Sequence, residues 1–409
     1  MRIQVLSQFF DPEPVPIPGM VARWLLAQGH DVDVVTGFPN YPGGSFYRSD
    51  PVRPFRRLRQ GALRVSRVPL YPSHDRSSVR RALNYTSFSA AATVLAPALT
   101  ERPDAGYVYH PPATSALPFL ARRIPFVFHI QDIWPDSVVN AGMIGGSRSR
   151  RMVTRGLDLW CSYVYEQSAA LVVISAGMKT ILVERGVPAT KISVIPNWAD
   201  ESIFHPQPKD PSLLDALGIA DKFNVMYSGN LGIYQDLDSV LQAAVLLRDE
   251  SNIQFVFAGS GPMEGELRAR ASQLGLDNVV FLGRLPYDTM GAVTASVDLL
   301  LVTLRDLPFF AATIPSKTQA AMACARPIVM SVSGDAAQLV SDAECGRACT
   351  PGDATSMATT IRELSRRGTA ELDSMGRRGR EYYEAHMSMQ TGLARLEELL
   401  LGVARRTHP

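Results

Sequence analysis

The chain has 409 residues, too many for one ordinary hydrophobic core, which predicts two domains of roughly 200 residues each. Hydrophobic residues make up 46% and charged residues 20%, a globular composition, and no stretch reaches the ~18 uninterrupted apolar residues of a membrane-spanning helix. The formal net charge of +2 gives no global reason to expect a nucleic-acid partner.

Short β-branched runs alternate with helical patterns from the first residue onward, which is typical of βα units around parallel sheets. The first run alternates apolar and polar residues, as a strand does, and this favours a cytoplasmic protein over an exported one. A helix is predicted at 20–28, before the stop signal at Gly29. Strands are predicted at 2–7, 31–36, 105–109, 125–130, 170–175 and 192–195.

A polar, proline-rich segment at 195–223 interrupts this alternation and predicts a junction between domains. We place an N-terminal Rossmann-like domain at 1–200 and a C-terminal one at 201–385, and we expect a helix at about 386–409 to pack back on the first domain. In the second domain, helices are predicted at 237–248, 263–274, 316–324 and 336–341. Its predicted strands are 224–227, 253–258, 279–282, 298–302, 328–331 and 347–349.

Three turns in the second half directly follow predicted strands and directly precede predicted helices. They are SGNLG (228–232), GSG (259–261) and TIPSK (313–317). The first amides of a helix lack intrahelical partners and carry the positive end of its dipole, so an anion is favoured there. Because parallel sheets bind ligands at the carboxyl ends of their strands, we expect one crevice that binds a phosphate-bearing ligand. Taken singly, each glycine has an ordinary backbone explanation.

Lys317 adds a cation to the third turn, in a chain with only four other lysines. A lysine at the start of a helix opposes the dipole, which favours a nearby anion. The alternative interpretation is an exposed surface charge.

Polar groups also follow a predicted strand of the first half, in the segment FVFHIQDIWP at 126–135. His129, Gln131 and Asp132 lie around the carboxyl end of this strand, where ligands bind. His129 has the alternative role of a hydrogen-bonded core histidine, and Asp132 that of a turn cap. The proline-rich loop at 8–19 suits a cleft wall, with a rigid connector as the alternative.

Nine arginines lie between 53 and 81, with Asp75 as the only acid among them. Together with the apolar stretch at 82–99, the segment from Arg53 to Arg81 could bind an anionic membrane surface that carries a lipid-linked acceptor. Peripheral attachment to the cytoplasmic membrane face would follow. The alternative is a solvated loop and a core helix. The four cysteines have no zinc-type spacing, so we expect reduced thiols and no metal site.

Taken together, these residues resemble glycosyltransferase family 4 of the GT-B architecture, in particular its bacterial surface-polysaccharide branch, over nearly the whole chain. The resemblance is carried by FFDPE (9–13), GHDVDVVTGFPNYPGG (29–44), QDIWPDS (131–137), IPNWAD (195–200), SGNLGIYQDLDSVLQAA (228–244), FVFAGSGP (255–262) and IPSKTQAAMACARPIV (314–329). It implies an α/β fold with two Rossmann-like domains whose parallel sheets face across a cleft. It also implies an activated sugar in the C-terminal domain, an acceptor largely in the N-terminal domain, and no metal or other cofactor.

The resemblance also implies roles for individual residues. The donor diphosphate is assigned to Gly229, Asn230, Gly232, Ser316 and Lys317, and the nucleoside to Gly259, Gly261, Arg284, Leu285 and Pro286. Catalysis is assigned to Gly19, Asp132 and Lys317, and the acceptor or sugar to His110, His129 and Gln131. The family's usual glutamate pair falls at Ala312 and Ala320, and the basic residues of its first phosphate loop are replaced by Asn230 and Gln235.

We therefore expect a retaining transferase that moves a sugar, with a UDP-linked amino sugar favoured, to a glycan, polyprenyl-linked or small-molecule acceptor. Fixed amides and Lys317 would stabilise the departing diphosphate. Two alternatives stay open. A sugar-nucleotide epimerase of the same architecture would need no acceptor, and a non-catalytic nucleotide-sugar-binding partner subunit agrees with Ala312 and Ala320.

Overall fold

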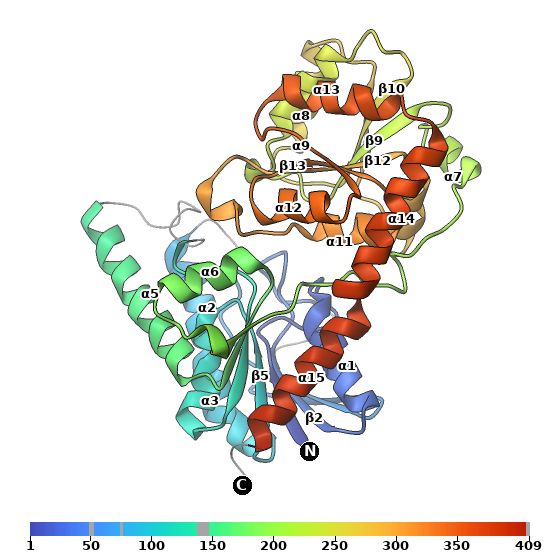
Figure 1. The fold of residues 1–409 in the computed structure, drawn as a ribbon. Coiled ribbons are helices and arrows are strands. Elements are labelled where there is room, and N and C mark those ends of the chain that lie inside the picture. The colour runs from blue at the N-terminus through green and yellow to red at the C-terminus, as the bar shows by residue number, and fades with distance from the viewer. Residues whose placement is uncertain (49–52, 74–76, 137–146, 406–409) are drawn as a thin grey trace. The chain divides into compact units, whose positions relative to one another are not determined.

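The computed structural model describes residues 1–48, 53–73, 77–136 and 147–405. The chain forms two compact units (Figure 1). The N-terminal unit comprises Met1–Ile174, Met178–Ile195 and Leu393–Pro409, and the C-terminal unit comprises Ser175–Gly177 and Pro196–Gly392. The main crossing therefore follows Ile195, inside the proline-rich segment, and the end of the chain returns to the N-terminal unit.

The N-terminal unit is built on a sheet of eight strands in the order β3-β4-β2-β1-β5-β6-β7-β8. Every neighbouring pair is parallel except β3 and β4. Every residue of β5 and β6 is buried, as expected of central parallel strands covered on both faces. The strands are β1 (Arg2–Leu6), β2 (Asp31–Gly37), β3 (Arg56–Gln60), β4 (Leu63–Val68), β5 (Ala105–Tyr109), β6 (Phe126–Ile130), β7 (Ala170–Val173) and β8 (Ile192–Val194).

Helices pack around this sheet, and the last helix of the chain is fastened to the first. Glu397 accepts a hydrogen bond of 3.0 Å from Trp24 Nε1, and its other carboxylate oxygen lies 2.9 Å from His30 Nε2. The helices are α1 (Pro16–Ala27), α2 (Ser78–Leu99), α3 (Leu117–Arg122), α5 (Ser147–Gln167), α6 (Ala176–Glu184) and α15 (Met389–Arg405).

The arginine-rich segment contains a β-hairpin, so the solvated loop considered for it is wrong at 56–68. β3 and β4 pair antiparallel at the edge of the sheet. Arg67 is only 2% exposed and donates to the carbonyl oxygens of Gly37 and Asp11. The apolar stretch at 82–99 lies within helix α2, and Arg76 lies outside the described residues.

The C-terminal unit has a fully parallel six-stranded sheet in the order β11-β10-β9-β12-β13-β14. Successive residues of a strand enter different cores, since Val225 belongs to one buried cluster and Met226 to the other. The strands are β9 (Phe223–Ser228), β10 (Ile253–Ala258), β11 (Val279–Gly283), β12 (Leu299–Thr303), β13 (Ile328–Ser331) and β14 (Gly346–Ala348). The helices are α7 (Pro211–Ala216), α8 (Leu237–Leu246), α9 (Glu264–Gln273), α10 (Met290–Ser296), α11 (Ser316–Ala323), α12 (Asp335–Asp342), α13 (Ala354–Ser365) and α14 (Thr369–His386).

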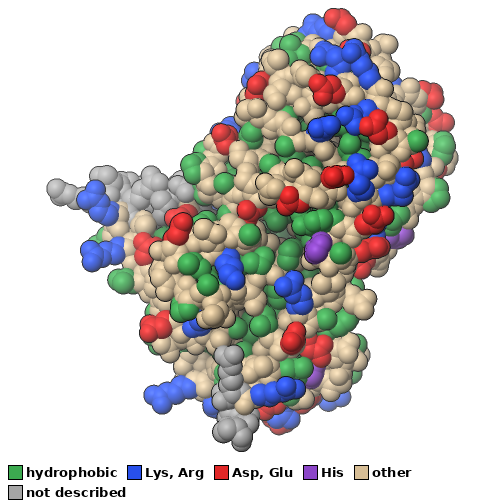
Figure 2. Space-filling model, in the orientation of Figure 1, with side chains coloured by type: hydrophobic (Ala, Val, Ile, Leu, Met, Phe, Trp, Pro, Cys, Tyr) green, Lys and Arg blue, Asp and Glu red, His purple; other side chains and the backbone are tan. Residues whose placement is uncertain are grey.

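These two sheets confirm the predicted α/β class with two parallel-sheet domains. Acidic and basic side chains are interspersed over the face shown in Figure 2. Within the described ranges, no helix has the length and apolar character to cross a bilayer.

Candidate active site

Two glycine turns of the C-terminal unit lie against each other at the carboxyl ends of β9 and β10. The backbone amide of Leu231 donates to the carbonyl of Ser260 over 3.0 Å. Gly259 has a φ of +155°, and a Cβ atom there would lie 1.8 Å from the carbonyl oxygen of Gly229. A Cβ on Gly261 would lie 2.5 Å from the Leu231 carbonyl oxygen. The turns meet because glycine lets their backbones approach this closely.

Lys317, in the first turn of α11, joins the same cluster. Its ammonium donates to Gln235 Oε1 over 2.8 Å and lies 4.5 Å from the centre of the Tyr227 ring. The Tyr227 hydroxyl donates to the same Gln235 oxygen over 2.9 Å. A Cβ on Gly229 would lie 3.1 Å from Lys317 Cε. The structure thus brings the third predicted turn to the other two.

The surroundings of Lys317 leave its charge poorly compensated. Burial lowers the pKa of Lys317 to about 8. Its hydrogen-bond acceptor, Gln235, is neutral, and in the described part of the chain no carboxylate forms an ion pair with Lys317. A desolvated cation beside glycine turns is a typical anion-binding environment, because a bound anion would restore the lost solvation.

The remaining predicted donor residues surround this cluster. Asn230 and Ser316 are exposed, and a Cβ on Gly232 would lie 2.7 Å from Asn230 Nδ2. The amide of Gly259 donates to the Gly283 carbonyl over 2.8 Å, at the end of β11. Arg284, Leu285 and Pro286 follow directly, with Arg284 and Pro286 exposed. These residues therefore continue the same edge of the sheet, one strand beyond the glycine turns.

In the N-terminal unit, Asp132 follows the carboxyl end of β6. Its side chain reaches solvent, yet protein surrounds it closely enough that desolvation raises its pKa. Burial raises the pKa of Tyr109, at the end of the neighbouring β5, and the charge of Asp132 adds to this rise. The half-buried Gln131 lies beside it in the chain. This edge therefore carries a carboxylate that keeps its proton to higher pH than an ordinary aspartate.

The two predicted acceptor-binding histidines lie in the core. His129 is fully buried and His110 is 1% exposed, and burial lowers the pKa of each to about 3. His129 Nδ1 lies 2.7 Å from the Tyr107 hydroxyl oxygen, which fits the alternative of a hydrogen-bonded core histidine. The ring of His110 packs edge-on against Trp134. Direct contact with an acceptor is therefore not supported for these two neutral imidazoles.

Gly19 lies inside a helix rather than in a loop, which corrects its sequence-based placement. Helix α1 begins at Pro16, because proline suits the first helical position, where no amide hydrogen is needed. A Cβ on Gly19 would lie 2.9 Å from the carboxylate of Asp11, which pairs with Arg23 over 2.5 Å. Gly19 therefore gives room to this ion pair, at the carboxyl end of β1.

Glu13, which the sequence analysis did not single out, holds the loops after β1 and β2 together. It is 3% exposed, and its carboxylate accepts hydrogen bonds from the backbone amides of Phe10, Asn40 and Tyr41. Desolvation raises its pKa, against the opposing effect of these hydrogen bonds. An acid between two prolines, Pro12 and Pro14, was the available signal, but two of its three partners, Asn40 and Tyr41, lie on a different strand connection.

Within the described ranges, no group of three or more histidines, cysteines, aspartates or glutamates is placed to bind a metal ion. The four cysteines are buried free thiols: Cys161, Cys324, Cys345 and Cys349.

Comparisons with known proteins identify the family. Residues 17–198 match the family model for a glycosyl transferase 4-like domain, and residues 213–382 match the model for glycosyl transferases group 1. The chain is 30% identical over 318 residues to the putative colanic acid biosynthesis glycosyl transferase WcaI of Escherichia coli, covering 75% of this chain and 77% of that protein.

Solved structures share the fold at low sequence identity. HepE from Anabaena, solved in complex with UDP, superposes with a TM-score of 0.73 at 19% identity, over 98% of this chain and 100% of that one. WaaG, a glycosyltransferase involved in lipopolysaccharide biosynthesis, gives a TM-score of 0.67 at 15% identity, again over 98% and 100%. The chain therefore belongs to glycosyltransferase family 4 and is a glycosyltransferase with the GT-B fold.

Proposed function

We propose that this enzyme transfers a sugar from a UDP-linked donor, an amino sugar in the favoured case, to a glycan, lipid-linked or small-molecule acceptor, with retention and formation of an α-linkage. The observation that carries the proposal is the desolvated ammonium of Lys317 beside the two glycine turns. HepE was solved with UDP, and WcaI is named for colanic acid biosynthesis, which support the donor class and a saccharide acceptor.

In the proposed reaction, the bond between the anomeric carbon and the diphosphate oxygen breaks while an acceptor hydroxyl oxygen bonds to the same face of the sugar. The hydroxyl proton passes to the departing phosphate, so no protein carboxylate is needed as a nucleophile. Lys317 and the backbone amides of the turns stabilise the negative charge that develops on the leaving group. Gln235 and Tyr227 hold the ammonium beside the turns before substrate binds.

Asp132 is the proposed acidic group of the N-terminal unit. Its raised pKa suits a carboxylate that accepts a hydrogen bond from a sugar or acceptor hydroxyl in a desolvated place. We expect the reaction to need neither a metal ion nor an organic cofactor, because Lys317 and the amides supply the positive charge.

Arginines that stay exposed on the N-terminal unit are proposed to contact an anionic membrane when the acceptor is lipid-linked. Arg53, Arg59 and Arg80 are of this kind. Flotation with anionic liposomes tests this part, and it fails if the protein shows no salt-sensitive binding.

The donor test is a panel of UDP-, GDP- and dTDP-sugars, read first as thermal stabilisation. A ligand at 100 times its Kd adds about 2.7 kcal/mol to the free energy of unfolding. The stabilising donor is then incubated with acceptors, and the anomeric configuration of the product is determined by NMR. An α-linked product from a UDP-sugar supports the proposal, and a β-linked product contradicts retention.

The same assay separates the two alternatives. Conversion of the donor sugar without any acceptor would identify an epimerase. Donor binding without transfer or hydrolysis would indicate a non-catalytic subunit, in agreement with alanine at positions 312 and 320.

A further inference from the structure

A cavity of about 910 Å³ lies in the N-terminal unit at the amino ends of β1, β2 and β4, beside the C-terminal end of α2. Carboxylates among its lining residues are Asp33 and Glu101. Arginines in its lining are Arg2, Arg57, Arg59, Arg64, Arg102 and Arg122. We call this cavity the arginine pocket.

The strand registers explain why the arginines face one space. Arg64 of β4 lies opposite Asp33 of β2 on one side and Arg59 of β3 on the other. Residues directly opposite each other on neighbouring strands point to the same face of a sheet. Arg57, two residues before Arg59, shares that face. The arginine-rich hairpin therefore presents a row of guanidinium groups toward α2.

Four of the six arginines already have partners in the protein. Arg2 and Arg64 form ion pairs with Asp31, and Arg64 also pairs with Asp33. Arg57 donates to the Ala98 carbonyl over 2.7 Å, near the end of α2. Arg102 donates to the carbonyls of Arg122 and Arg123.

Arg59 and Arg122 differ from the other four arginines. Among the described residues, the carboxylates at the pocket pair with Arg2 and Arg64 and with neither Arg59 nor Arg122, and the Nη1 atom of Arg122 is buried without a hydrogen-bond partner. Burial, together with the nearby charge of Arg102, lowers the pKa of Arg122. A buried guanidinium nitrogen without an acceptor is costly, and an anion in the pocket would remove that cost.

We propose that the arginine pocket binds an oxyanion of the phosphate or diphosphate type. Planar guanidinium groups match phosphate oxygens in bidentate geometry, and several arginines around one cavity favour an anion with more than one charge. The pocket lies at the amino ends of the strands, whereas Asp132 follows the carboxyl end of β6. The ligand is therefore separate from the proposed acceptor contact at Asp132.

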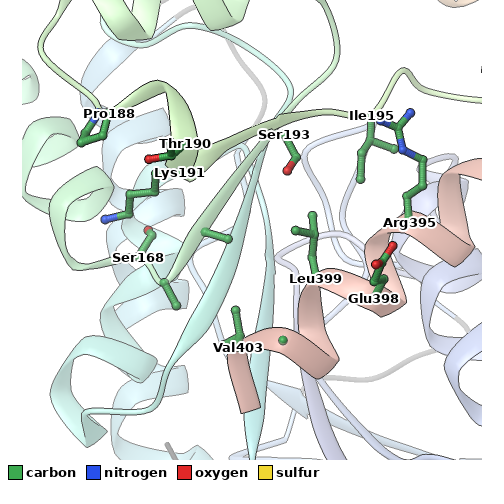
Figure 3. Close-up of a pocket in the computed structure, with 13 residues that line it drawn as sticks. Ser168, Pro188, Thr190, Lys191, Ser193, Ile195, Arg395, Glu398, Leu399 and Val403 are labelled. Atoms are coloured by element: carbon green, nitrogen blue, oxygen red, sulfur yellow. The ribbon is translucent and has the colours of Figure 1, made fainter. Parts of the chain in front are cut away.

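A further cavity of this unit lacks these features. It has about 780 Å³ and lies between β8 and α15 (Figure 3). Its two cations, Lys191 and Arg395, share the lining with Glu398, and Lys191 already donates to the Glu166 carbonyl over 2.6 Å.

The test is calorimetric titration with pyrophosphate, in a Lys317→Ala background that removes the cation of the proposed donor site. We expect this background protein to bind pyrophosphate, and we expect Arg59→Gln and Arg122→Gln each to weaken the binding about tenfold. The matched control is Arg155→Gln, an exposed arginine on α5 of the same unit, which should leave affinity unchanged. If Arg122→Gln lowers thermal stability, the affinity of Arg59→Gln, a variant at an exposed position of the edge strand, decides whether the pocket binds pyrophosphate.

Equal pyrophosphate affinity in the background protein and the pocket variants, or no binding at all, would overturn the proposal. A vesicle experiment identifies the source of the anion. Here only Arg122→Gln is informative, because Arg59 is also assigned to direct membrane contact. Loss of phosphatidylglycerol vesicle binding in Arg122→Gln, against unchanged behaviour of Arg155→Gln, supports a lipid phosphate as ligand. Pyrophosphate binding with vesicle binding unaffected by Arg122→Gln supports a soluble one.

Discussion

Replacing Lys317 with methionine removes the ammonium and keeps an unbranched side chain of similar length, so it isolates the charge. In the ligand-free protein the ammonium has one neutral acceptor, Gln235, and stacks on Tyr227. A charge-assisted hydrogen bond to a diphosphate is typically worth about 1.5 to 3 kcal/mol. We therefore expect Lys317→Met to weaken UDP binding about 10- to 150-fold.

The pH dependence makes this prediction specific. The pKa of Lys317 is lowered to about 8, so its positive charge is present below that pH and is lost above it. UDP affinity of the wild-type enzyme should therefore fall as pH rises through about 8, and the affinity of Lys317→Met should not. The stability of the ligand-free protein should depend on pH in the opposite direction. Between about pH 8 and pH 10.5, the usual lysine pKa, Lys317 is protonated in the unfolded chain and neutral in the folded one, so its contribution to the free energy of unfolding rises with pH.

The assay is calorimetric titration of UDP at several pH values on either side of the Lys317 pKa. Lys179→Met serves as the matched control, since it removes a lysine of α6 that lies outside the cluster. Lys317→Arg, which keeps its charge, should restore affinity at high pH. If Lys317→Met bound UDP as tightly as the wild type, or showed the same decline with pH, the proposed role of the ammonium would be refuted.

Three further predictions concern single residues. Gly259→Ala places a methyl group 1.8 Å from the Gly229 carbonyl oxygen, at a φ of +155°. It should therefore lower the free energy of unfolding by about 2 kcal/mol or more and weaken UDP binding. Unchanged unfolding in urea would contradict this prediction. Glu13→Gln turns an amide group toward backbone amide donors and should lower the free energy of unfolding in urea by about 1 to 3 kcal/mol. A variant as stable as the wild type would show that these hydrogen bonds matter little. The pKa of Asp132 is raised, so kcat/KM should increase with pH as this carboxylate ionises, above the pH range of an ordinary aspartate. Asp132→Asn should abolish this rise of kcat/KM with pH. If the rise persisted in Asp132→Asn, it would belong to another group.

The predicted parallel strands were the most reliable part of the sequence analysis. β5, β10 and β13 have the predicted bounds, because short apolar runs between turn residues leave little ambiguity. β3 and β4 were missed, since arginine fills positions that alternate with Leu58, Leu63 and Val65 and conceals the period of two. The carboxylates that pair with Arg64 come from β2, and nothing local indicates them.

For the candidate site, the meeting of the three glycine or proline turns could be predicted, because chain order and parallel topology place them at one edge of a sheet. The partners of Lys317 could not. Gln235 and Tyr227 are 82 and more residues away in the chain, and their contact with the ammonium depends on how α11 packs. The two alternatives for His129 could not be separated for the same kind of reason, since only packing shows that its imidazole points into the core.

The central claim is that the donor diphosphate binds where Lys317 meets the glycine turns, and a crystal structure with UDP tests it most directly. We predict phosphate oxygens about 2.7 to 3.2 Å from Lys317 Nζ and from backbone amides of the turn at 229–232. A diphosphate bound elsewhere, with the ammonium of Lys317 still on Gln235 alone, would contradict the claim.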